Sequence, residues 1–245
     1  MIGTELLDDP RADPVLVGRE LRDIACLNAL FGGTWAVVSE LEPFFERRRR
    51  EMGSGKGETW TLLDVGTGSG DIALAARATA RRRGIDLKTI GLELNPTAAR
   101  IAAAAGVPTI VADGSALPVG ARSVDVIVAS QVLHHVPRAV AVRWIAAFDR
   151  LARHAVVLAD LRRSRAAMAG VWAASVGLAM SGVTRHDAVV SLKRGYTREE
   201  FSDLLREAGV AAVARCRPGF RIVASWAPQA SSVIRNPLSG VSDHG

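Results

Sequence analysis

A short segment, LLDVGTGSGDIALAAR at residues 62–77, limits the possible folds more than any other part of the chain. Its first residues form a strand-like run that leads directly into glycines at alternate positions, Gly66, Gly68 and Gly70, and an alanine-rich stretch follows. Because glycine has no Cβ, it permits a tight turn and lets a ligand approach the backbone closely. The segment therefore predicts a strand, a ligand-binding loop and a helix in immediate succession.

Apolar runs alternate with helical stretches from residue 60 onward. We expect strands at 61–65, 87–92, 108–111, 124–129, 155–160, 210–216 and 220–226, and helices at 70–83, 96–105, 138–152 and 197–208. This alternation predicts an α/β fold: a Rossmann-like, mainly parallel seven-stranded sheet with helices on both faces. The pair Pro218 and Gly219 separates the last two runs and predicts an antiparallel C-terminal hairpin.

Three segments lie outside this alternation. Residues 1–56 are expected to form an N-terminal helical cap, with helices within 15–50 and a linker at 52–57. The main domain then spans residues 57–228 and includes a helical insertion at 161–195, after the fifth strand. Residues 229–245 are expected to form a flexible tail.

Composition limits the protein's class. Although 49% of the residues are apolar, no uncharged apolar run reaches the roughly 20 residues that span a bilayer, so no stable membrane insertion is expected. The first residues, MIGTELLDDPRADP, are acidic and polar, unlike a secretory signal, and we expect a cytoplasmic protein. Cys26 and Cys216 lack the spacing of a disulfide framework or a zinc site.

The net charge of +6 comes with arginine clusters at 47–50, 81–83 and 162–165. Such clusters can bind phosphates. The first two clusters fall at expected helix ends, where cations oppose the partial negative charge of the helix C-terminus. We therefore expect solvated helix ends and no nucleic-acid partner, although an RNA-binding enzyme stays an alternative that retention on heparin would test.

The glycine loop excludes two common phosphate-binding motifs. Its spacing is G-x-G-x-G rather than the G-x-G-x-x-G of dinucleotide-binding loops, and no lysine stands at the P-loop position. Asp64 precedes the loop and would repel a pyrophosphate. An acid at this position suits a ligand that carries an ammonium and a sulfonium.

Four motifs, in order, resemble those of the class I S-adenosylmethionine-dependent methyltransferases: LLDVGTGSGDIA, IGLELNP, VADGSALPV and SVDVIVASQVLHHV. The resemblance covers most of residues 60–226 and implies S-adenosylmethionine as the cofactor. It implies that Glu93 binds both ribose hydroxyls, since a carboxylate has two acceptor oxygens, and that Asp113 accepts from the adenine amino group. The implied cofactor-binding residues are Asp64, Gly66, Thr67, Gly68, Gly70, Glu93, Leu94, Asp113, Gly114, Ser115, Ser130 and Gln131.

Family patterns that are missing favour a small-molecule acceptor. The fourth strand is not followed by the Asn/Asp-Pro-Pro-Tyr loop of base-nitrogen methyltransferases, and neither cysteine occupies the position of a cytosine-methylating nucleophile. Asp160 ends the fifth strand, but Ala129 and Ser130 end the fourth, so the acidic cluster of metal-dependent catechol methylation is absent. We expect no metal.

The segments outside the sheet are apolar enough to cover a hydrophobic acceptor. The aromatic and apolar residues expected there are Phe31, Trp35, Phe44, Phe45, Met168, Trp172, Leu178 and Met180. Ligand pockets are mostly apolar with a few polar groups. The alternative, that these helices pack on each other or form a homodimer face, stays open.

Histidine is the natural general base for removing a hydroxyl proton before methyl transfer. The candidates are His186, adjacent to Asp187 in the insertion, and the pair His134 and His135 after the fourth strand. We select His186 and His135, with Arg185 and Arg194 as cations that would favour the acceptor's anion.

The overall pattern resembles bacterial methyltransferases of polyketide-derived phenolic lipids and quinone-like rings. This resemblance implies O-methylation of an aromatic or enolic hydroxyl on a hydrophobic body. C-methylation of a quinone precursor, RNA methylation and a non-catalytic cofactor-binding role remain alternatives.

Overall fold

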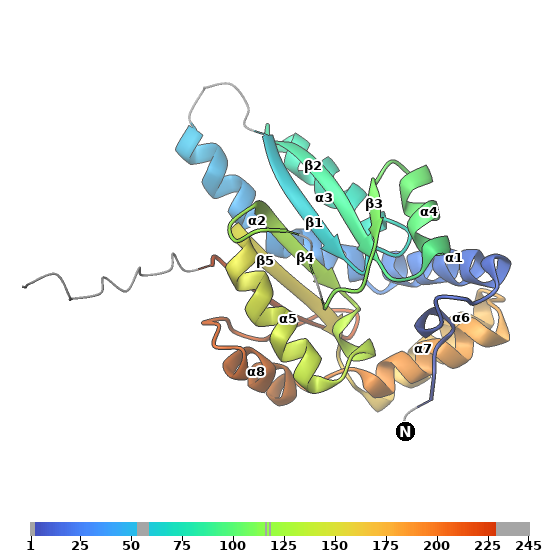
Figure 1. Ribbon diagram of the computed structural model, residues 1–245. Coiled ribbons are helices and arrows are strands. Elements are labelled where there is room, and N and C mark those ends of the chain that lie inside the picture. Colours follow the sequence, from blue (N-terminus) through green and yellow to red (C-terminus); the bar gives the residue numbers. More distant parts are fainter. Residues whose placement is uncertain (1–2, 53–58, 116, 118, 229–245) are drawn as a thin grey trace, which may run out of the picture.

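The computed structural model describes residues 3–52, 59–115, 117 and 119–228, and it contains one seven-stranded sheet (Figure 1). The expected tail at 229–245 and most of the expected linker lie outside these residues. The strands are β1 (Thr59–Val65), β2 (Asp86–Glu93), β3 (Thr109–Val111), β4 (Val124–Ser130), β5 (Ala152–Leu161), β6 (Arg215–Arg217) and β7 (Arg221–Trp226).

The strand order is β3-β2-β1-β4-β5-β7-β6. The first five strands in this order are parallel, and β7 is antiparallel to both β5 and β6. The predicted mainly parallel sheet with an antiparallel C-terminal hairpin is therefore confirmed. The sheet order reverses direction between β1 and β4, and ligands of open α/β sheets bind at the carboxyl ends of the strands near such a point.

The predicted sixth strand, at 210–216, is largely wrong, because β6 covers only Arg215–Arg217. The apolar residues before it have another explanation. Val210, Ala212 and Ala214 pack against the core without pairing with a neighbouring strand, while Val213 is 61% exposed. The alternation of buried and exposed residues at 210–214 thus comes from a coil segment that packs on the core, and not from a strand.

Helices cover both faces of the sheet, as predicted. One face is packed by α5 (Arg138–Leu151) and α8 (Arg198–Glu207), with Trp144, Phe148 and Phe201 in its core. The other is packed by α3 (Asp71–Arg82) and α2 (Gly33–Met52), and α4 (Pro96–Ala104) lies beside α3. The pattern of each helix explains its place, because its apolar residues recur on one side.

The N-terminal segment divides between two roles, which corrects the prediction of a single cap. Helix α2 buries Val37, Leu41 and Phe45 against the sheet face and does not lie over the strand ends. Helix α1 (Pro14–Leu30) does lie there, together with the 3₁₀ turn η1 (Leu6–Asp8) (Figure 1). Its start is fixed by Asp13, whose side chain accepts from Val15 and Leu16 N–H groups, and by Pro14 at the first helical position.

The insertion after β5 forms α6 (Arg165–Gly177) and α7 (Gly182–Arg194), which lie beside η1 and α1 (Figure 1). Ser164 and Ser181 begin these helices by accepting backbone hydrogen bonds. Among the described residues, no single helix is long and apolar enough to cross a bilayer, and one bent pair, α1 with α2, reaches that length and composition jointly.

Candidate functional site

The glycine loop is anchored across the end of β2. The N–H groups of Gly66 and Thr67 both donate to the carbonyl oxygen of Leu92, at 2.8 and 3.2 Å. Gly66 has φ 72°, and a Cβ there would lie 2.8 Å from Val132 Cγ2, so the position requires glycine. The predicted strand–loop–helix unit is confirmed, with Gly70 at the N-cap of α3.

Asp64 lies beneath this loop and is only 1% exposed. Its carboxylate accepts from the Thr67 hydroxyl at 2.9 Å, and no ion pair within the described part of the chain includes it. Burial raises the pKa of Asp64 to about 7, and the nearby charges of Asp71 and Glu93 add to the rise. A cationic ligand above the loop would complement this carboxylate.

Glu93 ends β2 and faces the loop. Its two carboxylate oxygens accept from the N–H groups of Gly68, at 2.9 Å, and Asn95, at 3.0 Å. Each oxygen keeps a further lone pair for a ligand hydroxyl. The carboxylate thus holds the glycine loop in place and remains able to bind a diol.

The third motif is fixed by a turn and by close packing. Asp113 accepts from the Ser115 N–H at 2.8 Å. A Cβ on Gly114 would lie 2.6 Å from the Trp144 ring, so any larger residue at this position would clash with the ring. Leu94 is 49% exposed at the rim. These residues all line one cavity.

A cavity of about 650 Å³ brings the predicted cofactor-binding residues together. Eleven of the twelve line it: Asp64, Gly66, Thr67, Gly68, Glu93, Leu94, Asp113, Gly114, Ser115, Ser130 and Gln131. Gly70 does not line it and acts through the backbone at the start of α3. The cavity lies within the 300–1,000 Å³ typical of small-molecule sites.

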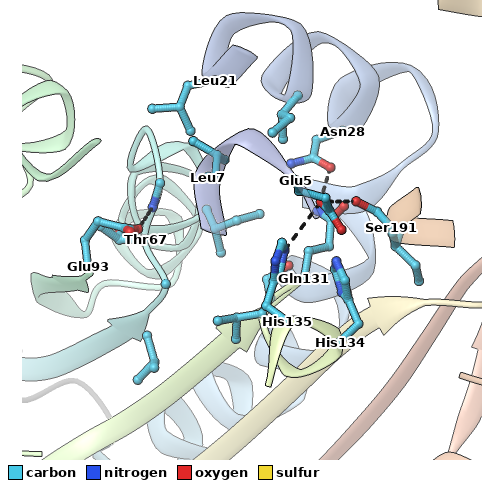
Figure 2. Close-up of a pocket in the computed structure, with 18 of the residues that line it drawn as sticks. Glu5, Leu7, Leu21, Asn28, Thr67, Glu93, Gln131, His134, His135 and Ser191 are labelled. Carbon is cyan, nitrogen blue, oxygen red and sulfur yellow. Dashed lines mark hydrogen bonds and ion pairs between the residues drawn. The ribbon is translucent and has the colours of Figure 1, made fainter. Parts of the chain in front are cut away.

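The cavity continues over β4, β5 and β7, where distant segments meet (Figure 2). Its apolar wall here includes Leu7, Phe31, Leu161, Val171 and Phe220. Of the eight aromatic and apolar residues expected to cover an acceptor, only Phe31 lines the cavity. Trp35 and Trp172 are instead 51% and 52% exposed, since their helices turn these positions to the outside.

His134 and Asp160 form a buried pair beside this wall. His134 lies in the 3₁₀ turn η2 (Leu133–His135), and its Nδ1 is 2.6 Å from Asp160 Oδ1, near the end of β5. Their side chains are 2% and 0% exposed. His134 Nε2 is buried and has no hydrogen-bond partner among the described residues. His134 itself lines the cavity, so a ligand bound there would be the candidate partner for this nitrogen.

His135 is held by the N-terminal segment. Its Nδ1 lies 2.7 Å from Asp8 Oδ1, and its Nε2 lies 3.8 Å from Glu5 Oε2 (Figure 2). Burial alone would lower the pKa of His135, but the hydrogen bond with Asp8 and the charges of Glu5 and Asp8 raise it above its ordinary value. The predicted base therefore carries a proton more readily than a free histidine.

Glu5, His134 and His135 offer ligand atoms that all lie within 4.8 Å of one another. The expectation of no metal rests on the end of the fourth strand, and these three residues lie outside that strand. Two of its members are already engaged, since Glu5 pairs with Arg194 at 3.0 Å and His135 pairs with Asp8. The absence of a metal stays a prediction.

The structure does not bring His186 and Arg185 into the cavity. Both line a separate, shallow hollow with Trp172 and Lys193. The neighbouring Asp187 faces inward and accepts from the Leu6 N–H at 2.7 Å. Because one helical residue corresponds to a rotation of about 100°, an inward Asp187 leaves His186 on the outer side of α7.

The sequence does not predict several of the cavity residues. Two of them, Arg221 and Asn28, form a network with the predicted Gln131: the Arg221 guanidinium donates to Gln131 Oε1 at 2.8 Å and to Asn28 Oδ1 at 3.2 Å. Glu5 and Asp8 come from a segment with no motif. Asp160, which contacts His134 but does not line the cavity, had a signal in the sequence: its place at the end of the fifth strand.

Residues 63–159 match a family model described as "Methyltransferase domain". This range begins in β1 and ends in β5, so it includes the glycine loop, Glu93, Asp113 and His134. No curated protein matches the sequence.

Solved structures share the fold at low sequence identity. Human N-acetylserotonin methyltransferase in complex with S-adenosylmethionine has a TM-score of 0.56 at 12% identity, covering 88% of this chain and 57% of that one. An O-methyltransferase family 2 protein from Planctomyces limnophilus, in complex with apigenin, has a TM-score of 0.53 at 18% identity over 86% and 62%. An S-adenosylmethionine-dependent methyltransferase from Aquifex aeolicus has a TM-score of 0.50 at 17% identity over 78% and 93%.

Proposed function

We propose that this chain, an S-adenosylmethionine-dependent methyltransferase by the match of residues 63–159, methylates a hydroxyl group of a hydrophobic aromatic or enolic small molecule. The acceptor class is that of polyketide-derived phenols such as alkylresorcinols. The observation that carries the proposal is the buried His134–Asp160 pair: His134 lines the cavity, and its Nε2 is without a partner among the described residues.

Asp64, Glu93 and Asp113 would hold S-adenosylmethionine, which would supply an electrophilic methyl group. The acceptor oxygen would bond to the methyl carbon as the carbon–sulfur bond broke, and the electron pair would remain on sulfur in S-adenosylhomocysteine. The hydroxyl proton passes to His134 Nε2. Asp160 keeps the imidazole N–H on Nδ1 and so leaves Nε2 as the acceptor, an arrangement that supports general-base catalysis.

His134 replaces His186 as the proposed base because of position. His186 lines the outer hollow and not the cavity. His135 contacts the cavity, but its Nδ1 is bonded to Asp8 and the same neighbours raise its pKa. We assign it a supporting role in holding η1 over the acceptor.

The apolar wall supports a hydrophobic acceptor. Phe31 follows α1, Leu161 ends β5, Val171 lies in α6 and Phe220 precedes β7, and all four line the same cavity as His134. Alignment of acceptor, methyl and sulfur in such a closed space supplies much of the rate of a bimolecular reaction. Two structural neighbours, one named for N-acetylserotonin and one bound to apigenin, are consistent with an aromatic acceptor.

The test is an incubation with isotopically labelled S-adenosylmethionine against phenols, alkylresorcinols, pyrones, quinols and tRNA, with products identified by mass spectrometry. Label on the hydroxyl oxygen of an apolar ring supports the proposal. Label on ring carbon alone assigns the chain to C-methylation of a quinone-type ring, and label on tRNA alone overturns a small-molecule acceptor. Cofactor binding without any transfer would indicate a non-catalytic protein.

A further inference from the structure

Arg221 is a buried cation at the acceptor end of the cavity. It begins β7 and pairs in register with Leu161, the last residue of β5. In the sheet, β4 and β5 therefore separate it from β1, the strand that leads into the glycine loop. The residue is 4% exposed and lines the cavity. Its position is therefore distant, in strand order, from the cofactor motifs at the ends of β1, β2 and β3.

The hydrogen-bond partners of the guanidinium are neutral. Its hydrogen bonds go to the side-chain amide oxygens of Gln131 and Asn28, and the Gln131 amide nitrogen donates to Asn28 at 2.7 Å. Its Nε is buried and without a partner among the described residues. Within the same part of the chain, no ion pair includes Arg221, whereas Arg215 and Arg217 of the same hairpin both pair with Glu40.

This arrangement leaves a buried positive charge without a bonded anion. Burial lowers the pKa of Arg221 to about 10, and the more distant charge of Asp160 only partly offsets this effect. An unpaired buried charge is costly, and proteins usually pair such groups with a counter-ion. A ligand anion in the cavity would supply the missing partner.

The backbone holds this network in place. A Cβ on Gly219 would lie 1.7 Å from the Phe31 carbonyl oxygen, so the turn before β7 touches the end of α1. This contact fixes Asn28, one turn earlier in α1, above Arg221. The guanidinium therefore has a fixed orientation, which favours two-point binding of a planar anion.

We propose that Arg221, held by Asn28 and Gln131, binds a carboxylate carried by the methyl acceptor. The inference is based on the proposed function and narrows its acceptor to hydrophobic aromatic or enolic acids. The carboxylate would lie at Arg221, the hydroxyl at His134 Nε2, and the apolar body against Phe31 and Phe220. Arg221 is thus a specificity-determining residue at the edge of β4, β5 and β7.

A matched pair of probes tests the charge preference directly. The two compounds are 6-hydroxy-2-naphthoic acid and its primary amide, which differ in charge and little in shape. Calorimetric titration uses the full chain saturated with S-adenosylhomocysteine. We expect the acid to bind at least about tenfold more tightly than the amide. Equal affinities would overturn the proposal.

Variants then assign the preference to Arg221. Arg221→Gln should remove the difference between acid and amide, and Arg221→Lys should retain part of it. Asn28→Asp keeps the arginine but places a carboxylate against it, so this variant should also lose the preference. Arg217→Gln, on the same hairpin but outside the cavity, is the control and should keep it. A preference that survives in Asn28→Asp would contradict the assignment, even if Arg221→Gln fails to fold.

The cofactor's own carboxylate is the other source of the same anionic group. If Arg221→Gln weakens S-adenosylhomocysteine binding about tenfold and the wild type does not discriminate acid from amide, Arg221 serves the cofactor and the proposal is overturned. Preferential binding of the acid without transfer to any hydroxyl would contradict only the proposed O-methylation. Equal binding of both probes with O-methylation of both would contradict only the acid subsite.

Discussion

His134 Nδ1 lies 2.6 Å from Asp160 Oδ1, and both side chains are shielded from solvent. The pair joins the turn after β4 to the end of β5, two segments that lie side by side in the sheet. The proposed mechanism places the imidazole proton on Nδ1, against Asp160, which leaves the lone pair on Nε2 of a residue that lines the cavity.

Replacing this base should reduce turnover without loss of the cofactor. We expect His134→Gln to lower kcat by about 10²–10⁴-fold, the usual contribution of a general base, with unchanged S-adenosylmethionine affinity. The matched control is His186→Gln on the outer side of α7, which should keep near-normal kcat. Steady-state kinetics measure both, and full activity in His134→Gln would remove this residue from catalysis.

Asp160 acts through His134 as a positioning residue. Asp160→Asn should lower kcat and change KM little, because the acceptor site keeps its shape while the tautomer of His134 is no longer fixed. A parallel fall in kcat and in cofactor affinity would instead point to a purely structural role. Thermal unfolding of the variant separates the two outcomes.

Glu93 is expected to dominate binding of the ribose. Glu93→Ala should weaken S-adenosylmethionine binding by about 1.5–3 kcal/mol, the range for hydrogen bonds to charged groups. The loss includes loosening of the glycine loop, since Glu93 also accepts from Gly68 N–H at 2.9 Å. Glu42→Ala, a surface carboxylate paired with Arg83, is the control. Unchanged affinity in the Glu93 variant, measured by calorimetry, would place the ribose elsewhere.

Cofactor affinity should depend on pH through Asp64. Burial raises the pKa of Asp64 to about 7 in the free protein, and the cationic cofactor favours the ionised form, so binding releases a proton below this pH. Affinity should rise with pH up to about 7, by up to about tenfold per unit, and then level off. In Asp64→Asn this dependence should disappear; if it persists in calorimetry from pH 5.5 to about 8.5, another group titrates.

The raised pKa of Asp64 has the opposite effect on the stability of the free protein, which should fall as the pH rises. A carboxyl whose folded pKa lies above its unfolded value of 3.8 stabilises the fold fully at low pH. This contribution is lost as the pH rises through about 7. S-adenosylmethionine should therefore raise the unfolding temperature more at pH 8 than at pH 5, which thermal unfolding can measure.

Turnover is expected to need no divalent metal. The fourth strand ends in Ser130 rather than in a carboxylate, and Glu5, the one acid of the histidine cluster, is paired with Arg194. Activity on any acceptor found should survive excess EDTA. Loss of activity that zinc or magnesium restores would identify Glu5, His134 and His135 as a metal site.

The cofactor half of the site was predictable because each motif is local. A strand end and the loop after it are contiguous in sequence, so Asp64, Glu93 and Asp113 could be placed from their own neighbours. The acceptor half is assembled from segments far apart in the chain: Leu6 contacts Asp187, and Asn28 contacts Arg221. No local pattern encodes these contacts.

The rotation of α7 about its axis decides which of its residues face the cavity, and the sequence does not reveal this rotation. The sequence-based selection of His186 as the general base is wrong in position for this reason. The stretch TRHD at positions 184–187 is polar at every residue, so composition alone does not identify the buried side. In the structure Thr184 and Asp187 are buried at 0% and 5% exposure. A one-residue difference in α7 thus separates the cavity from the outer hollow.

The most direct test of O-methylation with His134 as base is the position of a ¹³C-labelled methyl group in the product. The wild type and His134→Gln are incubated with labelled S-adenosylmethionine and the acceptor that reacts best, and carbon NMR distinguishes a methyl on oxygen from one on carbon. The account predicts an O-methyl signal that falls by at least about 10²-fold in the variant. A C-methyl signal, or an O-methyl signal of equal intensity in both proteins, would contradict it.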